Sequence, residues 1–526
     1  MSIENIKTDV IVIGAGISGL ATVKCLRDDG FRVIVLERTS EVGGLWTFRE
    51  HDYGVMRFTH INVSKYNYSF SDFPFPDETA DFPHHSDMAK YILDYTKHFQ
   101  LREHIKFRRK VTKLEQTGDN LGWRVTTQIL GEDGEPTDSE EIYEARYVAV
   151  ASGHHAKPVV ASFSGLDTFT GKAIHSVDFK DAVTNGMEGK RVLVVGIGNS
   201  GVDVATNCAS EGRCKSVYLS TRSGAWIYPN YIAGRATDLY ACRAFLNYIP
   251  WTVGSTIFET IVSFLLGHPR KWKLNPKMRA LQTQPTVSPT LIHHIQRRHI
   301  KIVPNIKKIE ENRVTFINDE SDEFDAIVLC TGYKIDLPFL EESVRSKVLD
   351  EETNSIKLYM NMVSPEIGHS LAFVGFIQPA SGGLLSMSEN QARWFTELCR
   401  GRVSLPTKAE MIQNIQDEEA ENASKYYKSS RHTIQRDPII YNDQITSFFG
   451  AKPELLKNPT LAWRLMVGSC GSAQYRLQGP GSWEGAKETV MKVPVTELMH
   501  YSLLLTMLLI PLAIYWIFSF LCFLVT

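Results

Sequence analysis

The chain has 526 residues, 43% of them hydrophobic and 22% charged, which is typical of a globular protein with several domains and excludes disordered and collagen-like chains. Its 57 Lys and Arg residues nearly balance 59 Asp and Glu residues, and a formal net charge of −2 offers no general attraction to nucleic acid. None of the 8 cysteines forms a C-x-x-C pair, so we expect no disulfide framework, no paired redox thiols and no metal site.

The first organised unit is a strand, a glycine-rich turn and a helix near the N-terminus. The apolar run 10–13 predicts a strand buried in a parallel sheet, and residues 20–29 are compatible with a helix. Between them lies a GxGxxG pattern made of Gly14, Ala15, Gly16, Ile17, Ser18 and Gly19. Such glycines permit a tight turn and let a pyrophosphate approach the helix N-terminus. Glu37 ends the next strand, 32–36, where its carboxylate would accept hydrogen bonds from ribose hydroxyls, so the first ligand is expected to have a free 2′-hydroxyl.

A second copy of this unit begins at residue 191. The strand 191–195 precedes another GxGxxG pattern, made of Gly196, Ile197, Gly198, Asn199, Ser200 and Gly201. The strand that follows, 216–220, ends in Thr221 and Arg222 instead of an acid. A guanidinium can hold a 2′-phosphate and a threonine adds a neutral donor, so this copy predicts NADP(H) binding. The alternative is that Arg222 is a solvated surface charge.

Two nucleotide sites with different ribose chemistry predict electron transfer from NADPH to a second dinucleotide, for which FAD is the expected candidate. Disulfide reductases need a cysteine pair near the flavin, and the spacing of the cysteines supplies none. We therefore expect O₂ to be the electron acceptor.

Several other blocks carry a family resemblance. Residues 169–179, FTGKAIHSVDF, resemble the FxGxxxHSxxx(Y/F) fingerprint of flavin-containing monooxygenases. Similar blocks of that family occur at 43–46, 70–76, 220–226, 330–333 and 478–481. The resemblance spans the whole chain and is greatest to the animal microsomal, membrane-anchored members.

The resemblance implies roles for particular residues. Asn62 matches the family asparagine beside the flavin and the nicotinamide, and is the expected catalytic residue. FAD contacts are implied for Gly14, Ala15, Gly16, Ile17, Ser18, Gly19, Glu37, Leu45, Trp46, Asn62, Val63 and the turn at Thr331. NADP(H) contacts are implied for Ile61, Asn62, Gly196, Gly198, Asn199, Ser200, Gly201, Val202, Asp203, Thr221 and Arg222.

The resemblance also implies a reaction. NADPH reduces FAD, O₂ adds at C4a, and the C4a-hydroperoxyflavin gives its distal oxygen to a soft nucleophilic N or S atom of a lipophilic amine or sulfide. Baeyer–Villiger oxygenation of ketones and an NADPH oxidase that releases H₂O₂ are the alternatives. A nucleotide-sensing membrane scaffold is a third.

The order of motifs predicts an α/β protein in which an NADP domain is inserted into an FAD domain. The expected segments are an FAD domain at 1–165, an NADP domain at 166–330 with an α-helical insertion at 226–294, a returning FAD segment at 331–445, an extension at 446–497 and a transmembrane anchor at 498–525. Residues 324–329 are expected to be the strand that returns to the FAD domain.

Two segments indicate membrane lipid as a partner. Residues 501–525 are apolar, and a helix of this length spans about 37 Å against a hydrocarbon core of about 30 Å. Lysines precede this segment and no positive charge follows it, so we expect a single-pass anchor in the endoplasmic reticulum membrane with a cytosolic catalytic body. Aromatic residues beside a basic cluster at 245–273 suggest either a membrane-interface element or a packed helical subdomain. A homo-oligomer remains open.

Overall fold

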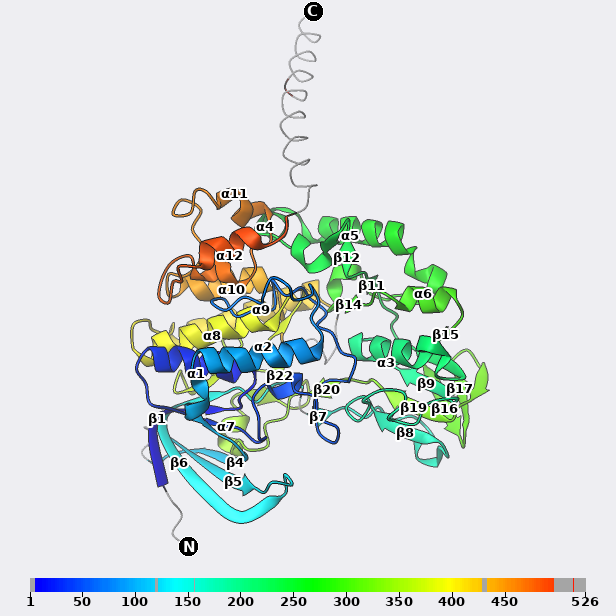
Figure 1. Cartoon of the computed structure of the whole chain (residues 1–526), viewed down its shortest axis with the longest axis horizontal. Helices are drawn as coiled ribbons and strands as arrows, with labels where there is room; N and C mark the ends of the chain where they lie inside the picture. The colour runs from blue at the N-terminus through cyan, green and yellow to red at the C-terminus, as the bar shows by residue number, and fades with distance from the viewer. Residues whose placement is uncertain (1–4, 119–121, 156, 428–432, 496–513, 515–526) are drawn as a thin grey trace, which may run out of the picture.

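The computed structural model describes residues 5–118, 122–155, 157–427, 433–495 and 514. Figure 1 shows two sheet regions next to each other, with most of the helices on the side opposite the N-terminus. Both sheets contain parallel strands built from the predicted strand–turn–helix units. The predicted α/β class with Rossmann-like sheets is therefore confirmed.

The first sheet contains the first glycine turn. Its parallel part has the order β3 (Ile105–Lys106), β2 (Val33–Leu36), β1 (Asn5–Ile13), β6 (Pro136–Val150), with β23 (Leu371–Phe373) on the far side of β6. Helices α1 (Ile17–Asp28) and α8 (Leu384–Cys399) pack against each other and share one core with the buried side chains of β1 and β2. The carboxyl ends of the strands therefore face the glycine turn, where ligands bind in such sheets.

Strand β6 belongs to two arrangements at once. Its last residues pair in parallel with β1, while its first part pairs antiparallel with β5 (Trp123–Leu130), which in turn pairs with β4 (Arg109–Gln116). This three-stranded meander was not predicted. Every second residue of β5 is buried, as at Trp123, Val125 and Thr127, and this alternation with more exposed residues is the period-two pattern that could have predicted the strand.

The second sheet carries the second glycine turn. Its parallel order is β15 (Ile300–Val303), β10 (Ser216–Ser220), β9 (Arg191–Val195), β19 (Ala326–Leu329), β8 (Lys172–His175). Strands β9 and β10 have the predicted bounds. An antiparallel group, β16 (Ile306–Glu310), β17 (Arg313–Phe316) and β18 (Ser321–Glu323), accompanies this sheet.

The prediction for residues 324–329 was wrong. This segment contains β19, which pairs with β9 and β8 and so belongs to the second sheet. The chain crosses back at β20 (Tyr333–Lys334), which pairs antiparallel with β7 (Lys157–Pro158), and rejoins the first sheet only at β23. A short apolar run fits any strand buried on both faces, so its local sequence does not specify which sheet it joins.

Most of the remaining helices lie above the two sheet regions in Figure 1. The insertion contributes α4 (Arg243–Tyr248), α5 (Trp251–Leu266) and α6 (Leu291–Gln296), together with the short strand pairs β11 (Ile227–Tyr228) with β14 (Thr286–Val287) and β12 (Tyr231–Ile232) with β13 (Arg235–Ala236). Further helices are α2 (His85–His98), α7 (Glu342–Arg345), α9 (Lys408–Lys425), α10 (Pro438–Ser447), α11 (Ala462–Val467) and α12 (Ala486–Lys492). Strands β21 (Leu349–Asp350) and β22 (Ser355–Ile356) pair with each other, as do β24 (Gln378–Pro379) and β25 (Gln435–Arg436).

Across the described ranges, no helix is both long and apolar enough to cross a bilayer. The anchor predicted at 498–525 lies outside those ranges, apart from Ile514.

A buried ionic cluster joins Arg476, near the end of the described chain, to α1, α8 and the segment 70–76. The Lys24 ammonium of α1 lies 2.9 Å from the Asp72 carboxylate, and the Arg476 guanidinium lies 3.1 Å from the same carboxylate. Arg476 also donates to Glu389 of α8 at 2.8 Å, and the backbone N–H of Ser71 donates to Glu389 at 2.8 Å. The block 70–76, noted in the sequence for its resemblance, thus contributes to a structural junction of four chain segments.

The two glycine turns have the same geometry. Gly14 and Gly196 have φ of +103° and +112°, in the region that favours glycine. A Cβ on Gly19 would lie 1.9 Å from the Gly14 carbonyl oxygen, and a Cβ on Gly201 would lie 1.9 Å from the Gly196 carbonyl oxygen. Each helix can therefore approach its strand this closely only with glycine at the third position of the motif.

We predict that Gly19→Ala prevents the flavin expected from the sequence from being retained. The new methyl group must displace α1 from the turn, at a cost of about 3 kcal/mol or more, and this moves the N–H groups of the first helical turn. The measurement is the ratio of flavin absorbance to protein in purified material. Gly118→Ala is the control, because a Cβ there meets no atom within 4 Å. Equal flavin content in the two variants would contradict this account of the turn.

Candidate functional site

A cavity of about 390 Å³ opens at the first glycine turn. The sequence-predicted residues that line it are Gly14, Gly16, Ile17, Ser18, Glu37, Leu45 and Trp46. Ala15 and Gly19 support it from behind, Ala15 as a fully buried residue and Gly19 in contact with the Gly14 carbonyl. Lining residues that sequence reasoning did not single out include Arg38, Arg49, Tyr53, Tyr68, Lys110 and Val111.

Glu37 fixes the turn as well as facing the cavity. Its Oε2 accepts a hydrogen bond from the Ala15 backbone N–H at 2.7 Å. Its Oε1 accepts from the Thr39 backbone N–H at 2.8 Å and from the Thr39 hydroxyl at 2.9 Å. A carboxylate has about four acceptor sites, so capacity remains for ribose hydroxyls. The glycine cradle, the open helix end and this carboxylate together fit the FAD expected from the sequence.

The aromatic and imidazole side chains that line this cavity do not exchange protons near neutral pH. The Trp46 indole N–H donates to the Tyr68 hydroxyl at 3.2 Å, and burial raises the pKa of Tyr68 to about 12. His154 pairs through Nδ1 with the Gly375 carbonyl at 3.0 Å, and burial lowers its pKa to about 4. Burial lowers the pKa of His155 to about 3, with a smaller contribution from His154. Both imidazoles are therefore uncharged at neutral pH.

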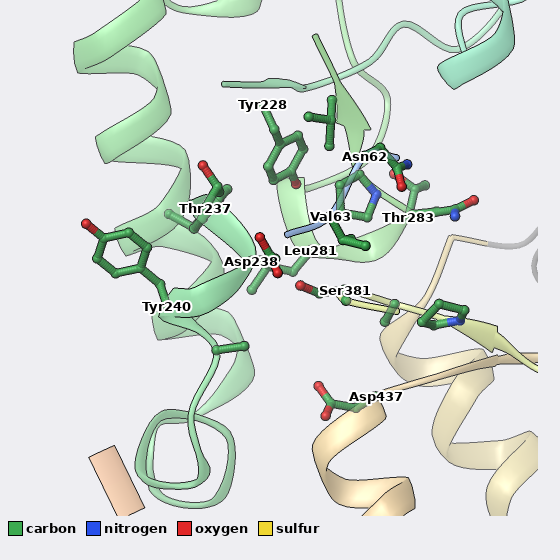
Figure 2. Close-up of a pocket in the computed structure, with 18 of the residues that line it drawn as sticks. Asn62, Val63, Tyr228, Thr237, Asp238, Tyr240, Leu281, Thr283, Ser381 and Asp437 are labelled. Atoms are coloured by element: carbon green, nitrogen blue, oxygen red, sulfur yellow. The ribbon is translucent and has the colours of Figure 1, made fainter. Parts of the chain in front are cut away.

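A second cavity, of about 230 Å³, adjoins Asn62 and Val63. Figure 2 shows residues from the Asn62 segment, the insertion, the 379–382 loop and the start of α10 around one space. Its apolar wall comprises Phe82, Tyr228, Phe245, Leu246, Ile249, Trp251 and Phe258. The Asn62 side chain is exposed, and its amide makes no hydrogen bond with any described residue. Ile61, its neighbour, is 2% exposed and lies in the core of the first domain.

Asp238 attaches the insertion to the segment that follows Asn62. Its Oδ2 accepts from the Ser64 hydroxyl at 2.8 Å and from the Asn67 amide at 2.7 Å. Burial raises the pKa of Asp238, and these hydrogen bonds offset part of that rise. The second cavity therefore has one wall that is held to the Asn62 segment by a buried carboxylate.

The second glycine turn is connected to the same cavity. Asn199, the first residue of α3 (Asn199–Ala209), donates through Nδ2 to the Pro285 carbonyl at 3.1 Å. Its Oδ1 accepts from the Val287 backbone N–H at 2.9 Å. Because β14 pairs with β11, this ties the helix N-terminus to the strand of Tyr228, which lines the cavity.

The other residues predicted to bind NADP(H) differ in exposure to solvent. The exposed Gly198 precedes α3, and Ser200 is half-buried in its first turn. Gly201 and Val202 are buried in packing, and burial raises the pKa of the half-buried Asp203 to about 7. The exposed Arg222 makes no ion pair with the described residues.

The turn residues on either side of this site already have partners. The Thr221 hydroxyl accepts from the Gly224 backbone N–H at 2.9 Å, which leaves its own proton free to donate. Thr331, predicted to face the flavin, is 7% exposed and donates its hydroxyl to the Val159 carbonyl. It joins the two crossover segments and does not line either cavity.

Neither cavity is built for thiol or metal chemistry within the described ranges. No cysteine there lines either cavity, and no group of three or more His, Cys, Asp or Glu residues could hold a metal ion.

Comparison with known proteins identifies the family. A model described as flavin-binding monooxygenase-like matches residues 7–498. Flavin-containing monooxygenase 5 of Oryctolagus cuniculus is 36% identical over 504 residues, covering 92% of this chain and 91% of that protein. Dimethylaniline monooxygenase (N-oxide-forming) 2 of Mus musculus is 34% identical over 502 residues, with the same coverage of 92% and 91%.

Among solved structures, S-allyl-L-cysteine S-oxygenase from Allium sativum has a TM-score of 0.63 at 21% identity and covers 93% of this chain and 99% of its own, a likeness of fold. The chain therefore belongs to the flavin-containing monooxygenase family and is an NADPH-dependent flavin monooxygenase that uses FAD and NADP(H).

Proposed function

We propose that this enzyme oxygenates soft nucleophilic nitrogen or sulfur atoms of lipophilic small molecules by the C4a-hydroperoxyflavin route. The observation that carries the proposal is the Asn62 amide, which has no hydrogen-bond partner among the described residues and lines a cavity walled by aromatic and aliphatic side chains. An apolar wall favours the body of a lipophilic substrate. A neutral amide can both donate and accept a hydrogen bond without transferring a proton.

FAD would be held by the first cavity and NADP(H) by the second glycine turn, with Asn62 between them and the substrate. When bound, FAD supplies the oxygen chemistry, accepting a hydride from NADPH and activating O₂. The protein's own contribution is to orient the reactants and to exclude water and stray protons. The neutral His154 and His155 suit that task, because neither offers a proton to the cavity at neutral pH.

The test is a product screen with the purified full-length enzyme, NADPH and O₂. We expect N-oxide from a lipophilic tertiary amine and S-oxide from a thioether, each identified by mass spectrometry. Ester formed from a 2-alkanone, without either oxide, would reject the proposal in favour of Baeyer–Villiger oxygenation. H₂O₂ formed in proportion to NADPH, with no oxygenated product, would support the oxidase alternative.

In the same assay we expect Asn62→Ala to oxidise NADPH but to yield about tenfold less oxygenated product per NADPH, or lower still. H₂O₂ should account for the difference. Asn230→Ala is the matched control, because it makes the same change of side chain at another residue that lines the same cavity. An unchanged product yield in Asn62→Ala would remove this residue from the mechanism.

Arg222 would bind the 2′-phosphate of NADPH, since its exposed guanidinium has no acidic partner in the described ranges. Replacement by Gln removes a charge-assisted contact of about 1.5–3 kcal/mol, equivalent to about 10–150-fold in affinity. We predict that Arg222→Gln raises the KM for NADPH by about this factor and leaves the KM for NADH unchanged. An unchanged KM for both coenzymes would show that Arg222 is a solvated surface charge. An equal rise for both would show that it does not recognise the 2′-phosphate.

Helix α5 would lie in the interface of the endoplasmic reticulum membrane to which the predicted anchor at 498–525 would attach the chain, with the catalytic body on the cytosolic side. Every fourth residue of one face is an exposed aliphatic side chain, namely Val253, Ile257, Ile261 and Leu265. Phe264 is 89% exposed beside them, and the basic residues Arg270, Lys271 and Lys273 follow. An exposed apolar stripe next to cations is the pattern of an interfacial helix.

Brominated lipid provides the measurement. In liposomes containing the full-length protein, Phe264→Trp should add fluorescence that bromine on the acyl chains quenches. Ile317→Trp is the control, since Ile317 is exposed in the hairpin between β17 and β18 of the second domain. Equal quenching of the two added signals would contradict contact between α5 and lipid.

A further inference from the structure

Two cysteines of the second domain lie in contact, although their spacing in the sequence predicted no thiol pair. Cys208 lies in the last turn of α3, and Cys214 lies in the short loop that leads to β10. Both are free thiols and both belong to the apolar core of this domain, where Cys208 is fully buried and Cys214 is 7% exposed. The fold therefore brings two thiols together inside the domain expected to bind NADP(H).

The two residues are joined through their backbone and through their side chains. The Cys214 backbone N–H donates to the Cys208 carbonyl at 3.2 Å. The Cys208 thiol donates a hydrogen bond to the Cys214 sulfur. A backbone hydrogen bond between two residues places their Cα atoms about 5–6.5 Å apart, and disulfides join Cα atoms about 4.4–6.8 Å apart. A bond between these sulfur atoms therefore needs no large movement of the backbone.

The hydrogen bond makes the two thiols unequal in reactivity. The bond from Cys208 lowers the pKa of Cys214, although burial opposes this effect. The same bond, together with burial, raises the pKa of Cys208. The thiolate is the form of cysteine that reacts with oxidants, and Cys214 is also the more exposed of the two. Cys214 is thus the thiol expected to react first, with Cys208 beside it to resolve the product.

Other cysteines in the described ranges are less suited to this chemistry. Burial raises the pKa of Cys25 and Cys470, each to about 11, and it also raises the pKa of Cys330 and Cys399. These four side chains are therefore held as unreactive thiols. Cys330 is the alternative partner to test, because it belongs to the same core cluster as the pair.

We propose that Cys208 and Cys214 form a reversible disulfide when the enzyme is exposed to hydrogen peroxide. Peroxide is the product expected at this enzyme whenever NADPH is oxidised without oxygenation of a substrate. The inference does not depend on which substrate atom the enzyme oxygenates. It assigns a modification site to the second domain, outside both cavities.

The oxidation proceeds in two balanced steps. The Cys214 thiolate attacks one oxygen of H₂O₂, the O–O bond breaks, and the hydroxide that leaves takes up the proton lost by Cys214 to form water. Cys214 is now a sulfenic acid. The Cys208 sulfur attacks the sulfenic sulfur, the S–O bond breaks, and the hydroxide leaves as water with the Cys208 proton. Two thiols have then lost two electrons and two protons, and one peroxide has become two water molecules. A small thiol reductant reverses the change by exchange.

The position of the pair links it to the coenzyme-binding elements. Helix α3 begins at the second glycine turn and β10 is followed by Thr221 and Arg222, whereas the cysteines lie at the opposite ends of the same two elements. Figure 1 shows α3 alongside the strands of the second sheet. The disulfide would therefore fasten the end of this helix to the strand beside it.

The test uses trypsin, because a cleavage site separates the two cysteines. The full-length enzyme with FAD is freed of reductant, treated with H₂O₂, denatured with N-ethylmaleimide to block remaining thiols, and digested. Cleavage after Arg191, Arg213 and Lys215 releases the peptide 192–213, which contains Cys208, and the dipeptide Cys214-Lys215. We expect mass spectrometry to find these two joined, and the protein to lose two of its 8 thiols. Dithiothreitol should separate the peptides and restore both thiols.

Three variants identify the partners. Cys208→Ser and Cys214→Ser should each abolish the joined peptide, and in Cys208→Ser the unresolved Cys214 should be oxidised beyond the sulfenic acid. Cys330→Ser makes the same change at the neighbouring thiol and should leave the joined peptide intact. Flavin content and circular dichroism establish that each variant is folded.

Two results overturn the proposal. One is that Cys208 and Cys214 both remain blocked by N-ethylmaleimide, or that Cys214 is oxidised only to the sulfinic acid, in the wild-type enzyme after peroxide treatment. The other is a joined peptide that pairs Cys208 with Cys330.

Discussion

The cofactor-binding geometry of this molecule depends on the close packing of two helices, α1 and α3, against the glycine turns that precede them. At Gly19 and again at Gly201, the space for a side chain is taken by a backbone carbonyl 1.9 Å from the Cβ position. Only this approach places the first N–H groups of α1 and α3 at the carboxyl ends of the parallel strands. The helix ends then offer donors and partial positive charge to phosphates. Glu37 depends on the same geometry, because its bond to the Ala15 N–H exists only while the turn is closed.

The cavity beside Asn62 is shaped by buried polar contacts between distant segments. Asp238 of the insertion holds Ser64 and Asn67, and Asn199 of the second glycine turn holds the strand paired with Tyr228. Both contacts converge on the cavity beside Asn62. Burying such groups is favourable only when their hydrogen bonds are satisfied, so each contact tolerates few arrangements. The insertion is therefore a fixed wall of the site as well as a surface helix.

The sequence predicted the fold correctly where a whole structural unit, with its strands, turn and helix, lies within about 30 residues. The glycine motifs and strands β9 and β10 are such cases, and they were sufficient to predict the two sheets and both cofactors. Residues 324–329 illustrate the limit, because an apolar strand does not encode which of two sheets it joins. Asp238 and Asp437 illustrate it further. They are distant in sequence and each has an ordinary local context, so only the folded chain brings them to one cavity. The cofactor and catalytic roles of the individual site residues, Ile61 and Thr331 among them, stay predictions.

The main cavity combines two opposite requirements. Beside Asn62, the proposed oxygen transfer to a soft nucleophile needs a dry space without acidic protons, which the neutral amide and the aromatic wall favour. The uncharged His154 and His155 line the first cavity. At the far boundary lie the carboxyl groups of Asp238 and Asp437, and burial raises the pKa of both. A carboxyl group whose pKa is raised by burial would, if protonated, become a proton donor within the same cavity. The hydrogen bonds from Ser64 and Asn67 to Asp238, and the Lys425 ammonium near Asp437, favour the ionised carboxylates and so limit that conflict.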